Sequence, residues 1–185
     1  MIINHDREKL VEVVLFFAAN VRKLGKTKLY KLLYFLDFKH YRDTGRPVTG
    51  LDYFAWPKGP VPKALQEELK TPASDWQGRV SFTETQTARG IMLAVKALSN
   101  FNPDHFSKRE LRLLQQLADE FKHADADSMV EATHLENQPW HEIYEVQKAK
   151  QQNIPYSLAL RKQDDTEMQT HVVARAEFID AFSHE

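Results

Sequence analysis

The feature that most constrains this chain is a helix-length segment, residues 27–43, whose apolar and aromatic residues are spaced to cover most of the circumference of a helix. Leucines occupy one side of the expected helix and aromatic residues another, at Leu29, Leu32, Leu33, Leu36, Tyr30, Tyr34, Phe38 and Tyr41. A helix that is apolar over most of its circumference is stable in water only when other elements cover it. This segment therefore predicts a central helix that the remaining elements surround.

The residues before the central helix predict an amphipathic helix and a sharp break. Apolar residues recur there at spacings of three and four, at Leu10, Val14, Phe17, Val21 and Leu24. We expect Gly25 to end this helix in the left-handed conformation, and the Thr27 hydroxyl to cap the central helix.

The residues after the central helix indicate a small β element. Residues 51–56 are rich in aromatic side chains that favour a strand, and three prolines predict a stiff turn over residues 57–62, with Pro62 in the first turn of another helix. Further on, alternating apolar residues predict a hairpin over residues 79–96. A helix from residue 87 is the alternative.

Capping-box patterns indicate further helices near the C-terminus. Ser107 and Glu110 have this spacing, and Ser128 and Glu131 repeat it at the start of a shorter helix that reaches His134. A last helix is expected over residues 172–182. The predicted fold class is mainly α (α+β), a compact helical domain with a small antiparallel β element.

Composition excludes several classes of protein. Hydrophobic residues make up 42% and charged residues 28% of the 185 residues, as in an ordinary compact domain. The chain has no cysteine, which excludes disulfides, thiolate nucleophiles and cysteine-ligated metal sites. The longest apolar run, Val13–Ala19, is too short to cross a bilayer, and the first residues lack a signal-peptide pattern. We therefore expect a cytoplasmic protein without a membrane segment.

No residue pattern is typical of a catalytic or metal site. The six glycines are scattered, and no serine lies in a glycine-flanked elbow. His134, His141 and Glu142 could form a metal or acid/base site, but the histidines lie seven residues apart with Pro139 between them. A histidine that bonds a backbone carbonyl and packs against Trp140 is the alternative. We expect no catalytic residue, cofactor or metal.

Acidic residues give two weaker signals. Asp37 lies within the apolar helix, where an unpaired carboxylate is costly, so we expect a cationic or hydrogen-bonding partner, with catalysis as the alternative. Asp125 and Asp127 resemble the start of a calcium loop, but the required glycine and glutamate are missing.

Charge is unevenly distributed along a chain whose net charge is −1. Residues 1–72 carry 13 Lys and Arg against 8 Asp and Glu, whereas residues 119–145 carry one base and eight acids. A basic strip on the central helix contains Lys28, Lys31, Lys39 and Arg42. The strip could bind nucleic-acid phosphates, or it could form a protein-binding hot spot with Phe35 as its apolar anchor. Alternatively, Phe35 belongs to the core. Nucleic acid is the weaker hypothesis, because the chain is not basic overall and lacks a DNA-binding motif.

A series of short motifs runs through most of the chain. Residues 28–37 read KLYKLLYFLD, and after them come His40-Tyr41, Gly45-Arg46-Pro47, Trp56, Gly59-Pro60-Val61, Thr133-His134 and Pro139-Trp140. This series resembles the Panacea domain of SocA-like antitoxins. On that resemblance we divide the chain into a Panacea-like domain, residues 1–160, and a C-terminal extension, residues 161–185, packed on or beside it.

The resemblance implies a small helical protein that is not an enzyme and that neutralises a toxin encoded by the adjacent gene by binding it directly. It also implies that the shared motif residues hold the fold: Leu29, Leu33, Tyr34, Asp37, Trp56, Gly59, Pro60, His134 and Trp140. We expect the toxin to bind the basic strip and the turn at residues 57–62, through Lys28, Lys31, Phe35, Lys39, Lys58 and Val61.

Three other functions remain open. The resemblance also allows a proteolytic adaptor that delivers a toxin to an AAA+ protease, with residues 161–185 as the surface for the protease. A nucleic-acid-binding regulator is a weaker alternative. An enzyme that uses Asp37, His134 and His141 is the third.

Overall fold

The structure is a computed structural model, and it describes residues 5–88, 90–135 and 138–160. Its helices are α1 (Asp6–Asn20), α2 (Lys26–Thr44), α3 (Lys63–Glu68), α4 (Lys108–Phe121), α5 (Ala126–His134) and α6 (Pro139–His141). Single turns of other helix types are η1 (Ser74–Trp76), η2 (Glu142–Val146) and η3 (Tyr156–Ala159). The strands form two antiparallel hairpins, β1 (Tyr53–Trp56) with β2 (Gly59–Pro62) and β3 (Val80–Thr87) with β4 (Gly90–Ala97). The predicted fold class, mainly α with a small antiparallel β element, is confirmed.

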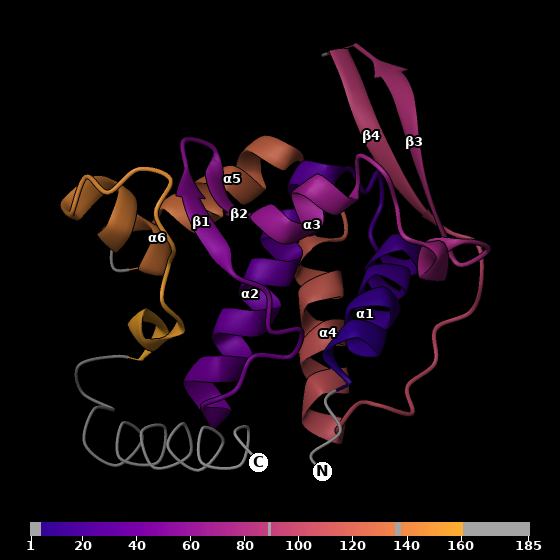
Figure 1. Cartoon of the computed structure of the whole chain (residues 1–185), viewed down its shortest axis with the longest axis horizontal. Helices are drawn as coiled ribbons and strands as arrows, with labels where there is room; N and C mark the ends of the chain where they lie inside the picture. The colour runs from indigo at the N-terminus through magenta and orange to yellow at the C-terminus, as the bar shows by residue number, and fades with distance from the viewer. Residues whose placement is uncertain (1–4, 89, 136–137, 161–185) are drawn as a thin grey trace.

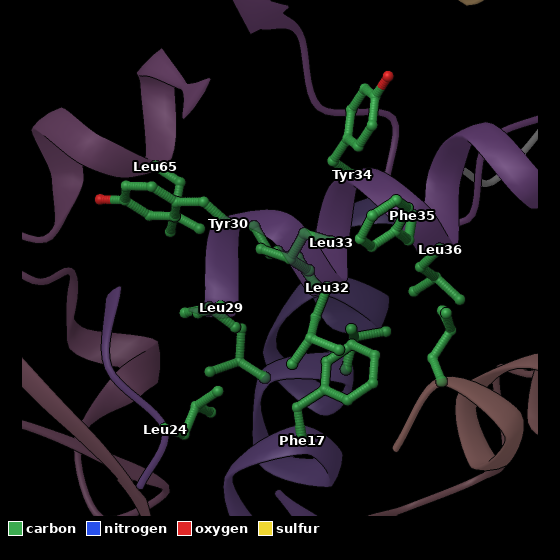
Figure 2. Close-up of a cluster of buried hydrophobic side chains, with 14 of the residues drawn as sticks. Phe17, Leu24, Leu29, Tyr30, Leu32, Leu33, Tyr34, Phe35, Leu36 and Leu65 are labelled. Carbon is green, nitrogen blue, oxygen red and sulfur yellow. The ribbon is translucent and has the colours of Figure 1, made fainter. Parts of the chain in front are cut away.

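Helix α2 lies at the centre of the molecule, with α1 and α4 on one side and the β1–β2 hairpin and α6 on the other (Figure 1). Its leucines at positions 29, 32, 33 and 36 are completely buried. Figure 2 shows them among side chains of α1, α3 and the segment that joins α1 to α2. The prediction of a covered central helix is confirmed, because removing this apolar surface from water requires contacts around its whole circumference.

The junction between α1 and α2 differs from the prediction. Helix α1 ends at Asn20, and Gly25 precedes α2 with φ −108°, so it is not left-handed. Helix α2 also has no side-chain cap, so the expected role of Thr27 is wrong. The reason lies in β4, where the Val95 amide donates to the Leu24 carbonyl at 2.9 Å. A Cβ at Gly25 would lie 2.9 Å from the Met92 side chain, so a larger residue there would require Met92 to move, and glycine allows the close approach of β4.

The first hairpin packs directly on α2. Strand β1 begins at Tyr53, within the predicted strand, and Trp56 pairs with Gly59. The sequence predicts a turn over residues 57–62, but residues 59–62 form the second strand, β2. Proline lacks an amide donor and is tolerated in such an edge strand. Residues 151–154 pair with the other edge of β1, where the Ala55 amide donates to the Gln152 carbonyl at 2.9 Å.

The predicted hairpin over residues 79–96 is confirmed as β3–β4, and the alternative helix from residue 87 is wrong. The capping box of α4 is confirmed, because the Ser107 hydroxyl accepts from the Glu110 amide and the Glu110 carboxylate accepts from the Ser107 amide. Helix α5 ends at His134 as predicted, but its cap is Asp125, which accepts from the Ser128 amide at 2.8 Å.

The helix expected over residues 172–182, and the whole extension 161–185, lie outside the described residues. Within the described part of the chain, no helix has the length and apolar character needed to cross a membrane.

Candidate functional site

The motif residues meet where α2 contacts the β1–β2 hairpin and the α5–α6 region. We call this group the motif cluster; its members are Lys31, Tyr34, Trp56, Gly59, Pro60, Thr133, His134 and Trp140. The Lys31 side chain lies inside it with 1% of its surface exposed. Its Nζ donates to the Pro60 carbonyl at 2.8 Å. Burial lowers the pKa of Lys31 to about 7, because removal from water disfavours the charged form.

Gly59 allows the parts of the motif cluster to approach one another. Its φ of +91° is in the region that side chains avoid. A Cβ there would lie 2.6 Å from Thr133 Oγ1 and 2.9 Å from Lys31 Nζ. Thr133 is itself buried and donates to the Val130 carbonyl at 2.7 Å. Glycine is therefore required at this position both for the backbone conformation and for the contact between β2, α2 and α5.

Trp140 joins the motif cluster to the α6 region. Its Nε1 donates to the Trp56 carbonyl at 2.9 Å, and its backbone amide donates to the Tyr34 hydroxyl at 3.3 Å. The ring stacks on His134 with centroids 3.8 Å apart, and on Tyr144 at 4.6 Å. The predicted packing of His134 against Trp140 is confirmed.

The carbonyl partner expected for the His134 ring is not found at Nε2, which is buried and has no hydrogen-bond partner among the described residues. Burial and the neighbouring Lys31 lower the pKa of His134, which favours the neutral imidazole.

Asp37 organises a second polar group deeper along α2. Its carboxylate accepts from the Val48 and Thr49 amides at 2.8 and 2.7 Å, and from the Thr49 and Tyr53 hydroxyls at 2.6 and 2.8 Å. The Tyr156 hydroxyl is 3.4 Å away. Burial raises the pKa of the Asp37 carboxyl, and the hydrogen bonds oppose part of that rise. The expectation that Asp37 has a hydrogen-bonding partner is confirmed, and several groups donate to its carboxylate.

The basic strip is not the exposed surface that the sequence suggested. Phe35 is 8% exposed and stacks on Phe121, so the expectation of an exposed aromatic anchor is wrong and the core alternative holds. Lys28 is buried as well, with its Nζ donating to the Arg22 carbonyl at 2.7 Å. Val61 is also buried. Phe35 lies inside because α4 packs against the face of α2 that carries it, a contact between segments far apart in the sequence.

Two of the predicted partner-binding residues have accessible side chains. Lys58 is exposed at the turn between β1 and β2. Lys39 is partly exposed, forms an ion pair with Glu120 at 3.4 Å and lies over the Phe35 ring.

Two residues of the enzyme hypothesis, Asp37 and His134, belong to different surroundings. Asp37 bonds to residues 48, 49, 53 and 156, and His134 stacks on Trp140, so the two share no hydrogen-bond partner. Across residues 5–88, 90–135 and 138–160, no group of three His, Asp or Glu side chains could hold a metal ion.

Sequence reasoning missed Thr49 and Tyr156 as partners of Asp37, and Thr133 as the neighbour of Gly59. The apolar setting of Asp37 signalled that partners were needed. Only the tertiary contacts, which bridge 119 residues in the case of Tyr156, identify them.

The fold and its two buried polar groups define a small, mainly helical domain built around one covered helix. The family model described as "Antitoxin SocA-like, Panacea domain" matches residues 29–141, more than half of the chain, and the protein belongs to this family. The match begins on α2 and ends at the last residue of α6, so it contains the whole motif cluster. Comparisons with curated proteins and with solved structures find no match.

Proposed function

We propose that this protein is a cytoplasmic antitoxin that neutralises a protein toxin by binding it directly, without catalysing a reaction itself. The observation that carries the proposal is its membership of the SocA-like antitoxin family together with the internal position of the motif residues. Lys31, Gly59 and Trp140 each contact other parts of the same chain. A family defined by such residues shares a scaffold, and the exposed surface is left to select the partner.

The local chemistry supports binding over catalysis. Lys31 is almost completely enclosed and contacts a carbonyl, and Asp37 is saturated with donors from its own chain. A general acid or base must reach the proton that it transfers, directly or through one water. Neither side chain has the access that such a role requires.

The direct test is co-expression with the product of the adjacent gene, each under its own inducible promoter. Growth should stop when that gene is induced alone and should resume when this chain is expressed with it. The two purified proteins should then form a stable complex. Absence of protection and of a complex would refute the antitoxin proposal.

Toxin abundance separates two modes of action. A binding inhibitor leaves the amount of toxin unchanged or higher, whereas a proteolytic adaptor shortens its lifetime. We expect an unchanged or longer toxin half-life after a translation block. A half-life that falls only when this chain is present would replace direct inhibition by the adaptor mechanism.

A further inference from the structure

The β3–β4 hairpin is the one pair of described strands that extends away from the helices (Figure 1). Residues 80 and 95, near its base, are buried, whereas residues 83–86 are all exposed. An isolated two-stranded hairpin is only marginally stable in water. The outer half of this hairpin therefore lacks the cover that the inner half receives.

The base of the hairpin is held firmly. Arg79, just before β3, forms an ion pair with the buried Glu12 of α1. On the other side the Val95 amide donates to the Leu24 carbonyl at 2.9 Å. Trp76 packs edge-on against Phe82 at 5.3 Å. These contacts fix the base and the direction of the hairpin, which lowers the entropy that a partner must remove when it binds the outer half.

The outer edge of β3 offers free backbone groups. The Leu98 amide donates to the Arg79 carbonyl at 2.7 Å, so residues 79 and 98 form a hydrogen-bonded pair. With Val80 opposite Ala97, the antiparallel alternation turns the amides and carbonyls of Phe82, Glu84 and Gln86 away from β4. Within the described part of the chain, β4 is the only strand that pairs with β3.

An apolar stripe continues along the same hairpin into solvent. Phe82, Val95 and Leu93 lie on one face, since paired residues and residues two apart share a face. Ile91 follows on that face and is 71% exposed. An edge with free donors beside an exposed apolar face is the arrangement that accepts an added strand.

We infer that an extended segment of the toxin adds to the outer edge of β3 as a third strand, and that the adjoining part of the toxin covers Leu93 and Ile91. This inference rests on the proposed antitoxin function. Glu84 is the only charged residue of β3. The segment is therefore expected to carry Lys or Arg beside Glu84, because opposite charges on neighbouring strands attract.

The same charge disfavours a second copy of this chain as the occupant. Antiparallel pairing of two β3 edges through their outward-facing residues puts the two Glu84 carboxylates opposite each other in one register. In the two adjacent registers they are diagonal neighbours, about 7–8 Å apart. Like charges at these positions repel, whereas a basic strand from another protein is attracted.

The experiment uses full-length chain and the purified product of the adjacent gene, inactivated so that it can be expressed. Binding of the wild-type chain is measured first, because its absence would refute the antitoxin proposal and this inference with it. If the complex forms, hydrogen exchange at the amides of Phe82, Glu84 and Gln86 should slow at least about tenfold, since these amides become hydrogen-bonded.

Glu84→Pro removes one outward amide and leaves the β3–β4 ladder intact, and it should weaken binding at least about tenfold. Glu84→Lys keeps the amide and reverses the charge, and it should also weaken binding, more strongly at low salt. Ile91→Ser should weaken binding about tenfold through lost apolar burial. Leu135→Ser, which removes another exposed apolar side chain at the end of α5, is the matched control and should bind as wild type.

Each other outcome is decisive. A complex that forms without slower exchange at residues 82, 84 and 86, and with full affinity in Glu84→Lys and Ile91→Ser, overturns the inference and leaves the antitoxin proposal standing. A wild-type dimer by light scattering that Glu84→Pro converts to a monomer assigns the edge to a second copy and overturns it too. Unchanged hydrogen exchange at the Thr83 and Thr85 amides would show that the β3–β4 hairpin is intact in Glu84→Pro. If the hairpin is not intact in that variant, the binding affinity of Glu84→Lys decides whether the toxin binds this edge.

Discussion

The Lys31 Nζ of α2 and the Pro60 carbonyl oxygen of β2 lie 2.8 Å apart in the interior of the domain. The contact fastens the first hairpin to the central helix. It also confines an amine to surroundings where burial lowers the pKa of Lys31 to about 7. A residue that suggested a toxin-binding surface in the sequence is therefore part of the scaffold.

Lys31→Met should change the pH dependence of stability. In the unfolded chain the Lys31 amine stays protonated up to about pH 10.5, whereas in the folded chain it loses its proton near pH 7. The unfolded state then binds more protons between these values, so stability rises with pH by up to about 1.4 kcal/mol per unit. Urea unfolding from pH 6.5 to 9.5 should show this rise in the wild type relative to Lys31→Met. Parallel curves for the two proteins would mean that Lys31 titrates normally.

Gly59→Ala should destabilise the domain much more than Gly78→Ala. Both glycines have positive φ, +91° and +69°, so both variants carry a backbone cost of about 1 kcal/mol. Only at position 59 would the new Cβ meet Thr133 and Lys31, and overpacking adds about 1–3 kcal/mol. Thermal unfolding of both variants provides the measurement. Equal losses would show that the clash is relieved by small movements.

Asp37→Ala should cost about 3 kcal/mol or more, because buried donors from Thr49, Tyr53 and the Val48 amide lose their acceptor. Asp43→Ala, near the exposed end of the same helix, is the control and should change stability by less than about 1 kcal/mol. Denaturant unfolding compares the two variants. Similar small losses would mean that water replaces the Asp37 carboxylate.

Phe35→Ala should lower the stability of the folded domain. The ring is buried and parallel to Phe121 with centroids 5.3 Å apart, so truncation should cost about 3–5 kcal/mol of unfolding free energy. Phe35→Leu should cost about 1–2 kcal/mol, since it retains most of the apolar volume. Calorimetry gives both values. A melting temperature for Phe35→Ala equal to that of the wild type would mean that the Phe35 ring is not part of the core.

Lys58→Glu tests the predicted partner-binding residue at the β1–β2 turn, whose side chain is exposed. Its position at the β1–β2 turn predicts an unchanged melting temperature, because single surface charges contribute little to stability. If Lys58 lies at the rim of the toxin interface, the association rate should fall several-fold at low salt and less at high salt. Stopped-flow association with the inactivated toxin at two salt concentrations measures this. If Lys58→Glu and the wild type associate at the same rate at each salt concentration, Lys58 does not lie at the interface.

Local signals in the sequence predicted much of the fold. Apolar and aromatic residues cover most of the circumference of α2, so its central position followed without knowledge of its neighbours. The capping box at Ser107 and the alternation around residues 79–96 also predicted the right elements. Gly25 was misread because its role depends on β4, about 70 residues further along the chain.

The candidate site was predicted less well, and the reason is the same. Lysines 28 and 31 looked like part of a wet strip, since charged side chains are usually exposed. Their long aliphatic stems and single ammonium groups can instead be buried when carbonyl acceptors lie in reach, and the Arg22 and Pro60 carbonyls provide them. No local sequence pattern shows which backbone carbonyl will lie within hydrogen-bonding distance of a given lysine.

The sequence by itself determined most of the described helices and strands, which helix is covered, and the family to which the motifs belong. Those properties depend on the order of neighbouring residues and on their apolar periodicity. The tertiary structure alone decided which side chains are internal and which edge is open: it buried Lys31 and Phe35, and among the described residues it left the β3 edge without a third strand. Burial and strand pairing are contacts between distant segments, and they become defined only when the chain has packed.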